Sequence, residues 1–143
     1  MAKKEIDVRF SKFGTVAFTS TSKVNDFIDK LEEGKVSGTQ CKDCGTKFFP
    51  PRADCYKCLT SNMDWFDVDG TGKLVTYSKL EYAPIGFEND LPYCIAVVDF
   101  GEYKVFGRIS SDLTDDDIKA GMDLKAVVNK LPNGQLNYVF EKA

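Results

Sequence analysis

The sequence CKDC at residues 41–44 and the sequence CYKC at residues 55–58 decide how this chain folds. Each is a C-x2-C knuckle, and ten residues separate the two. A C-x2-C turn directs two thiolates at one ion, so two knuckles complete a tetrahedral four-sulfur shell. The pattern predicts one structural Zn²⁺, because four thiolates leave no open position for a water. The predicted ligands are Cys41, Cys44, Cys55 and Cys58.

Two other uses of the four cysteines have to be weighed. Disulfides or redox pairs would fit an oxidising compartment, but the start of the chain, residues 1–5, has no hydrophobic stretch of a secretory signal behind it. We therefore expect a cytoplasmic protein with reduced thiols. Iron in the same four-sulfur site would make a rubredoxin-like electron carrier. The strong visible colour of such a site would distinguish it from colourless zinc.

Composition and charge limit the partners. The chain of 143 residues is 43% hydrophobic and 29% charged, as in ordinary soluble domains, and no apolar run approaches the roughly 20 residues of a membrane helix. The net charge is -3, and residues 66–143 carry eight basic and 13 acidic side chains. Such a surface repels phosphate backbones. We expect neither a membrane nor a nucleic acid as partner, although a nucleic-acid-binding module remains the alternative function, since zinc ribbons and OB-folds are both used in this way.

The sequence contains no histidine. This removes the commonest general base and the usual partner of a serine or cysteine nucleophile. A Gly-rich phosphate loop, a G-x-S-x-G elbow and an H-E-x-x-H motif are also missing from the sequence. We expect no catalysis by this chain alone, and no catalytic residue is assigned.

An N-terminal segment and docking helix are expected over residues 1–36. Apolar side chains recur at helical spacing between Ser22, a candidate N-cap, and Gly34, a candidate stop. They are Val24, Phe27, Ile28 and Leu31. The pattern predicts one buried face but leaves open whether this chain or another covers it.

The zinc ribbon is expected at 37–65 and a small closed barrel at 66–143. Five apolar, β-rich stretches in the second region predict strands. They cover residues 73–82, 93–100, 103–109, 124–131 and 136–140. A short helix is expected from Thr114 to Gly121, Asn133-Gly134 predicts a two-residue hairpin, and Cys94 is expected to be buried and inert. The fold class is therefore mostly β with an N-terminal helix: a rubredoxin-like zinc ribbon followed by a five-stranded OB-fold barrel.

An ordered series of short motifs over about residues 22–143 resembles a known family. The series is EGK at 33–35, CKDCG at 41–45, FPPR at 49–52, CYKC at 55–58, GKLVTYS at 72–78, YAP at 82–84 with GF at 86–87, PY at 92–93 and GM at 121–122. It is similar to the acyl-CoA-associated family in which a rubredoxin-like zinc ribbon precedes an OB-fold, long catalogued as a domain of unknown function. Many relatives have proline after the third cysteine, where this chain has Tyr56.

The resemblance implies a role and a ligand. Members look like non-catalytic accessory subunits of thiolases and related condensing enzymes, which form or cleave carbon–carbon bonds next to a CoA thioester. It implies a hetero-oligomer in which this chain helps to bind acyl-CoA. Lys47, Arg52 and Lys57 would meet a CoA phosphate, while an apolar channel would be lined by Phe48, Phe49, Ile85 and Phe87. The alternative is that these side chains only cover the metal, pack loops or contact another protein.

Overall fold

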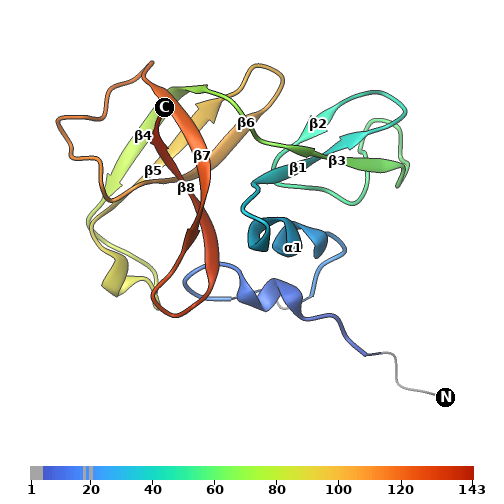
Figure 1. Ribbon diagram of the computed structural model, residues 1–143, viewed down its shortest axis with the longest axis horizontal. Helices are drawn as coiled ribbons and strands as arrows, with labels where there is room; N and C mark the ends of the chain where they lie inside the picture. Colours follow the sequence, from blue (N-terminus) through green and yellow to red (C-terminus); the bar gives the residue numbers. More distant parts are fainter. Residues whose placement is uncertain (1–4, 18, 20) are drawn as a thin grey trace.

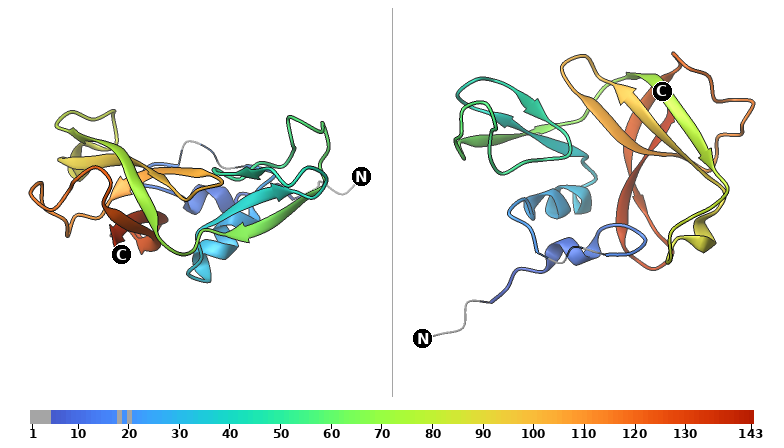
Figure 2. Two further views of the ribbon diagram at one scale, coloured as in Figure 1. Left: turned by 90° about the horizontal axis from the view of Figure 1, so that it is seen from above. Right: turned by 180° about the vertical axis from the view of Figure 1, so that it is seen from behind.

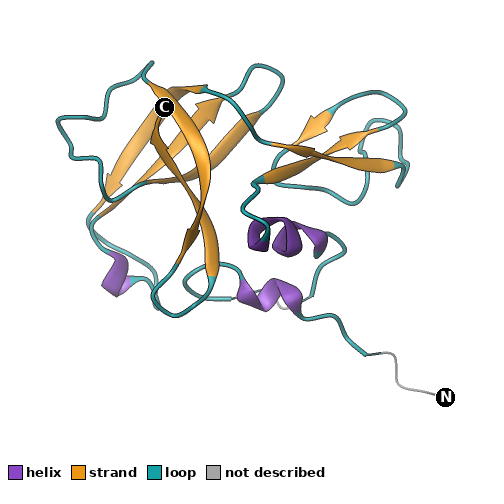
Figure 3. Ribbon diagram, viewed as in Figure 1, coloured by secondary structure: helices purple, strands orange, loops and turns teal. Residues whose placement is uncertain are grey.

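The computed structural model describes residues 5–17, 19 and 21–143, and it contains an N-terminal segment followed by two β modules (Figures 1 and 3). The N-terminal segment contains a 3-10 turn, η1 (Arg9–Lys12), and an α-helix, α1 (Asp26–Glu32). The first module has the strands β1 (Ser37–Cys41), β2 (Lys47–Phe48) and β3 (Met63–Asp67). The second has the strands β4 (Gly72–Leu80), β5 (Tyr93–Asp99), β6 (Lys104–Ile109), β7 (Asp123–Lys130) and β8 (Leu136–Lys142), with a 3-10 turn, η2 (Glu88–Asp90), before β5.

The first module is a small antiparallel sheet in the order β2-β1-β3. Thr39 in its central strand is buried and fixes the segment that follows β2. The Arg52 N–H donates to Thr39 Oγ1 over 2.7 Å, and the same hydroxyl donates to the Arg52 carbonyl over 2.8 Å. The backbone between the two knuckles is therefore held in one place.

The second module is a closed barrel in the order β4-β5-β6-β8-β7. Strands β6 and β8 are parallel, and the other neighbours are antiparallel. This is the order of an OB-fold, so the expected fold class is confirmed. Its interior is filled by alternate strand residues that are almost completely buried. They include Leu74, Val98, Val105, Leu124 and Phe140.

The apolar face of α1 is covered by this chain itself. Phe27, Ile28 and Leu31 are at most 3% exposed, and the helix contacts β1, β8 and η1. Figure 1 shows the helix between the ribbon sheet and η1, and Figure 2 confirms this from behind. The helix begins later than Ser22, whose hydroxyl instead accepts the Val24 N–H in a local turn over 3.2 Å. The helix therefore offers no free apolar face for a partner.

Three local predictions in the barrel were wrong. Residues 110–122 form turns and no helix, although Asp117 accepts capping hydrogen bonds from Thr114. The expected helix from Thr114 to Gly121 has only eight residues, and a helix of that length is marginal unless packing sustains it. The β7–β8 hairpin uses a three-residue loop, since Leu131 N–H bonds the Gln135 carbonyl and Pro132 occupies the second turn position. Cys94, the second residue of β5, is half-buried and not fully buried as expected.

The structure contains no helix, among the residues it describes, with the length and apolar character needed to span a bilayer.

Candidate metal centre

The two knuckles have the same backbone design. In the first, Gly45 N–H donates to the Cys41 carbonyl over 2.9 Å, and Gly45 has φ +74°. In the second, Leu59 N–H donates to the Cys55 carbonyl over 2.9 Å, with φ +54°. The turn needs a left-handed residue just after its second cysteine, which glycine adopts freely and leucine adopts at a cost of about 1–2 kcal/mol. In the sequence, a glycine marks only the first of these positions, Gly45.

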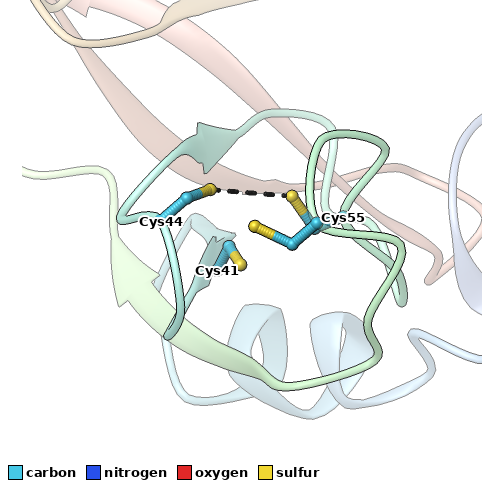
Figure 4. Close-up of side chains that lie close together, drawn as sticks. Cys41, Cys44 and Cys55 are labelled. Carbon is cyan, nitrogen blue, oxygen red and sulfur yellow. Dashed lines mark hydrogen bonds between the residues drawn. The ribbon is translucent and has the colours of Figure 1, made fainter.

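The four sulfurs converge on one point. All the Sγ atoms of Cys41, Cys44, Cys55 and Cys58 lie within 4.8 Å of one another. Cys44 Sγ and Cys55 Sγ are 3.7 Å apart and face each other in Figure 4. In a tetrahedron with Zn–S bonds of about 2.3 Å, the sulfurs are about 3.8 Å apart. The residues present therefore fit a structural zinc ion.

The electrostatics of the thiols also favour a cation. The Thr46 side chain, 3.2 Å from Cys44 Sγ, and the Thr46 backbone N–H lower the pKa of Cys44 to about 6. The hydrogen bond between Cys58 and Cys44 raises the pKa of Cys58 to about 12, with burial as the next cause. Neighbouring thiols cannot all lose their protons without a positive charge between them. Metal binding therefore has to displace protons from this cluster.

The aromatic residues after β2 have structural positions. Phe48 is 8% exposed, packs against Cys41 and Cys55, and meets the Tyr56 ring edge-on at 5.8 Å. Phe49 is half-buried and packs edge-on against Tyr138 of β8 at 5.4 Å. Phe48 therefore shields the metal centre, and Phe49 joins the ribbon to the barrel.

The three basic residues predicted to contact a CoA phosphate differ in whether an acidic side chain of this chain already pairs with them. Lys47 bonds Glu102 of the β5–β6 turn over 2.5 Å and lies above the Phe66 and Tyr103 rings. Arg52 and Lys57 are exposed and lie over aromatic rings of the ribbon itself, at 5.6 and 5.9 Å. The charge of Lys47 is neutralised within the chain, whereas Arg52 and Lys57 have no ion pair within the described residues.

The two candidates from the β4–β5 loop lie away from the ribbon. Ile85 is 90% exposed, while Phe87 is half-buried and lines a cavity at the barrel surface. The ribbon candidates do not line this cavity among the residues the structure describes. The structure thus does not bring the seven predicted contact residues together into a single channel within this chain.

The same cavity contains residues that the sequence did not single out. Val16 of the N-terminal segment, Tyr93, Phe106 and Arg108 all line it. Arg108 bonds Asp90 over 2.9 Å and stacks on the Tyr93 ring at 3.9 Å. In β6, the polar residues Lys104 and Arg108 share a face with Phe106 and are a sign that it lies outward. The sequence of β5 is apolar on both faces and gives no such sign for Tyr93.

Family models match most of the chain. Residues 29–64 match the model described as ChsH2, rubredoxin-like zinc ribbon domain, and residues 65–129 match ChsH2, C-terminal OB-fold domain. A DUF35 domain-containing scaffold protein of Methanocaldococcus jannaschii is 36% identical over 96 residues, which is 66% of this chain and 67% of the relative. A protein of the same description from Pyrococcus furiosus is 32% identical over 100 residues, 70% of this chain and 73% of the relative.

Solved structures share the fold. The structure described as the Ltp2-ChsH2(DUF35) aldolase superposes with a TM-score of 0.70 at 22% identity, covering 85% of this chain and 96% of that chain. A DUF35 protein of unknown function from Sulfolobus solfataricus gives a TM-score of 0.54 at 20% identity, covering 76% and 81%. From the two family models and the archaeal relatives together, we conclude that this chain belongs to the ChsH2-type DUF35 family of zinc-ribbon and OB-fold proteins.

Proposed function

We propose that this chain is a non-catalytic accessory subunit of an acyl-CoA thiolase or a related condensing enzyme. In this role it would help to bind the CoA thioester and complete or stabilise the active site of the partner. The observation that carries the proposal is family membership. The archaeal relatives are described as scaffold proteins, and one solved structure of this fold is described as the Ltp2-ChsH2(DUF35) aldolase.

The metal centre supports a structural rather than a catalytic role. Its four sulfurs would fill the shell of a zinc ion and leave no position for a water or a substrate. What the ion would supply is a rigid ribbon, since its binding energy is folding energy. The knuckles and the Thr39–Arg52 hydrogen bonds then fix the positions of the side chains around them.

Arg52 and Lys57 are the contacts that we propose for a CoA phosphate. Both side chains are exposed, and neither forms an ion pair within the described residues. The backbone of Arg52 is clamped by Thr39, so its guanidinium is presented from a fixed point. Lys47 is the weaker candidate because a phosphate would have to compete with Glu102.

Exposed apolar side chains on the β4–β5 loop support contact with a protein partner. Tyr82 and Ile85 are 91% and 90% exposed, next to the half-buried Phe87. Loops on a rigid barrel commonly carry binding residues, and a partner that covers this loop would remove its apolar surface from water.

Purification from native cells tests the proposal. An affinity tag on this chain, expressed at its natural level, should recover a thiolase-type condensing enzyme at a fixed stoichiometry. A variant that carries Arg52→Ala and Lys57→Ala should still recover that enzyme but should raise its KM for acyl-CoA. Recovery of the chain without any condensing enzyme would refute the accessory role.

A further inference from the structure

The N-terminal segment crosses the outer surface of the barrel as a strap, defined here as residues 10–17. On one side it is tied to the β7–β8 hairpin: Gly14 N–H donates to the Leu136 carbonyl over 2.8 Å, and Gln135 Nε2 donates to the Ser11 carbonyl over 3.0 Å. Figure 1 shows this blue segment beside the lower ends of β7 and β8. The strap is thus part of the folded barrel and not a loose end.

On the other side the strap is tied to the β4–β5 loop. Thr15 Oγ1 donates to Asp90 Oδ2 over 2.8 Å. Val16 packs directly on Gly86, where an added Cβ would lie 2.5 Å from Val16 Cγ2. Glycine is therefore needed at position 86, both for this close approach and for its φ of +97°. The strap bridges the two loops that flank the ligand face of an OB-fold.

The face beneath the strap is apolar. Tyr93 and Ile95 of β5 and Phe106 of β6 point outward, because alternate residues of both strands, such as Ala96 and Val105, fill the core. With Val16 and Phe87 they line a cavity of about 640 Å³ that opens to solvent. This volume is within the range of small-molecule sites.

The charge in the cavity is already balanced. Arg108 lies opposite Ile95 in the β5–β6 register and is paired with Asp90, and both of these side chains are 22% exposed. The site therefore offers no net positive charge to a polyanion, and the strap lies across the face that OB-folds use for oligonucleotides. A neutral, flexible hydrocarbon suits these walls better than a phosphate does.

From this geometry, we infer that the cavity under the strap is a binding site for the aliphatic acyl chain of a thioester, an inference that rests on the acyl-CoA function proposed above. The chain would lie between Val16 and Phe87 on one side and Ile95 and Phe106 on the other. The strap makes this a pocket rather than an open sheet face.

Calorimetric titration of the zinc-loaded full chain tests the inference without a partner enzyme. The probes are the acetyl, butanoyl and octanoyl thioesters of N-acetylcysteamine, which carry the acyl group without the nucleotide of CoA. Affinity should rise roughly two- to fourfold for each methylene that enters the pocket. Equal affinity for the acetyl and octanoyl thioesters would overturn the inference.

Matched variants locate the site. Phe106→Asp places a charge in the pocket and should weaken octanoyl binding at least roughly tenfold. Ile6→Asp makes a similar change at a position that is 70% exposed and does not line the cavity, so it should bind like the unaltered chain. Equal weakening in both variants would refute the assignment. If the Phe106→Asp variant loses zinc or its folded circular dichroism spectrum, a second variant, Val16→Ser, is used instead. Octanoyl binding that is unchanged by Val16→Ser would then refute the assignment.

The outcome separates this inference from the proposed function. Octanoyl binding by the isolated chain, without a copurifying condensing enzyme, would support the pocket and refute the accessory role. A copurifying enzyme that depends on this chain, without octanoyl binding, would support the accessory role and refute the acyl pocket.

Discussion

Replacing Phe27 with alanine tests whether one aromatic cluster joins the two β modules. Phe27 is 3% exposed. Its ring centroid lies 6.2 Å from that of Phe10, 5.6 Å from Phe13, 6.4 Å from Phe49 and 6.5 Å from Tyr138. These rings come from the N-terminal segment, the ribbon and β8, so the substitution removes a contact that all three parts share.

The expected loss follows from burial. Returning a fully buried phenylalanine side chain to water costs about 2–3 kcal/mol, and the cavity left behind adds about 2 kcal/mol where the neighbours cannot collapse. Four rings anchored in different elements collapse poorly. We expect the free energy of unfolding to fall by about 4 kcal/mol, a large share of the roughly 5–15 kcal/mol of a typical domain.

Urea unfolding of the zinc-loaded chain measures this loss with two probes. Fluorescence of Trp65, the single tryptophan, reports on the ribbon, and far-ultraviolet circular dichroism reports largely on the barrel. Both midpoints should shift together in Phe27→Ala. Phe106→Ala removes the same atoms from a side chain that is 56% exposed and should change the free energy by less than about 1 kcal/mol. Equal losses in the two variants, or a shift in only one probe, would contradict the proposed role of Phe27.

Three further predictions concern the metal, the barrel and the partner. Cys44→Ser should lose stoichiometric zinc and unfold the ribbon, and elemental analysis that finds one zinc per chain would contradict the four-ligand site. Burial raises the pKa of Tyr138, so the folded state keeps this proton while the unfolded state loses it, and stability should fall as the pH rises above about 10. Tyr138→Phe should flatten that slope in urea titrations between about pH 10 and 11, and an unchanged slope would assign it to other groups. Phe87→Ala should lower the activity of the complex by on the order of 100-fold through substrate misplacement, with zinc content unchanged; full activity in this variant would exclude Phe87 from the site.

The metal centre and the barrel were predictable because their signals are local. The knuckle spacing determines which sulfurs meet, and the alternating apolar residues of the strands determine which side chains fill the barrel. The same locality explains the errors. Asp115, Asp116 and Asp117 indicate a helix start, but a stretch that short lacks the packing needed to sustain a helix.

The strap was not predictable because its contacts are distant in sequence. Ser11 meets Gln135 and Thr15 meets Asp90, and no periodicity in residues 10–17 marks either pairing. For the same reason the sequence did not decide what covers α1. The separation of Phe87 from Arg52 and Lys57 also depends on how the ribbon packs on the barrel, which only the three-dimensional contacts reveal.

The most direct test of the accessory role is the steady-state kinetics of the copurified condensing enzyme with its acyl-CoA, measured with and without this chain. We expect kcat/KM to fall when the chain is removed and to recover when the zinc-loaded chain is added back. The chain that carries Arg52→Ala and Lys57→Ala should restore activity only at raised acyl-CoA concentration. Full activity of the enzyme without this chain, at the same KM, would contradict the account.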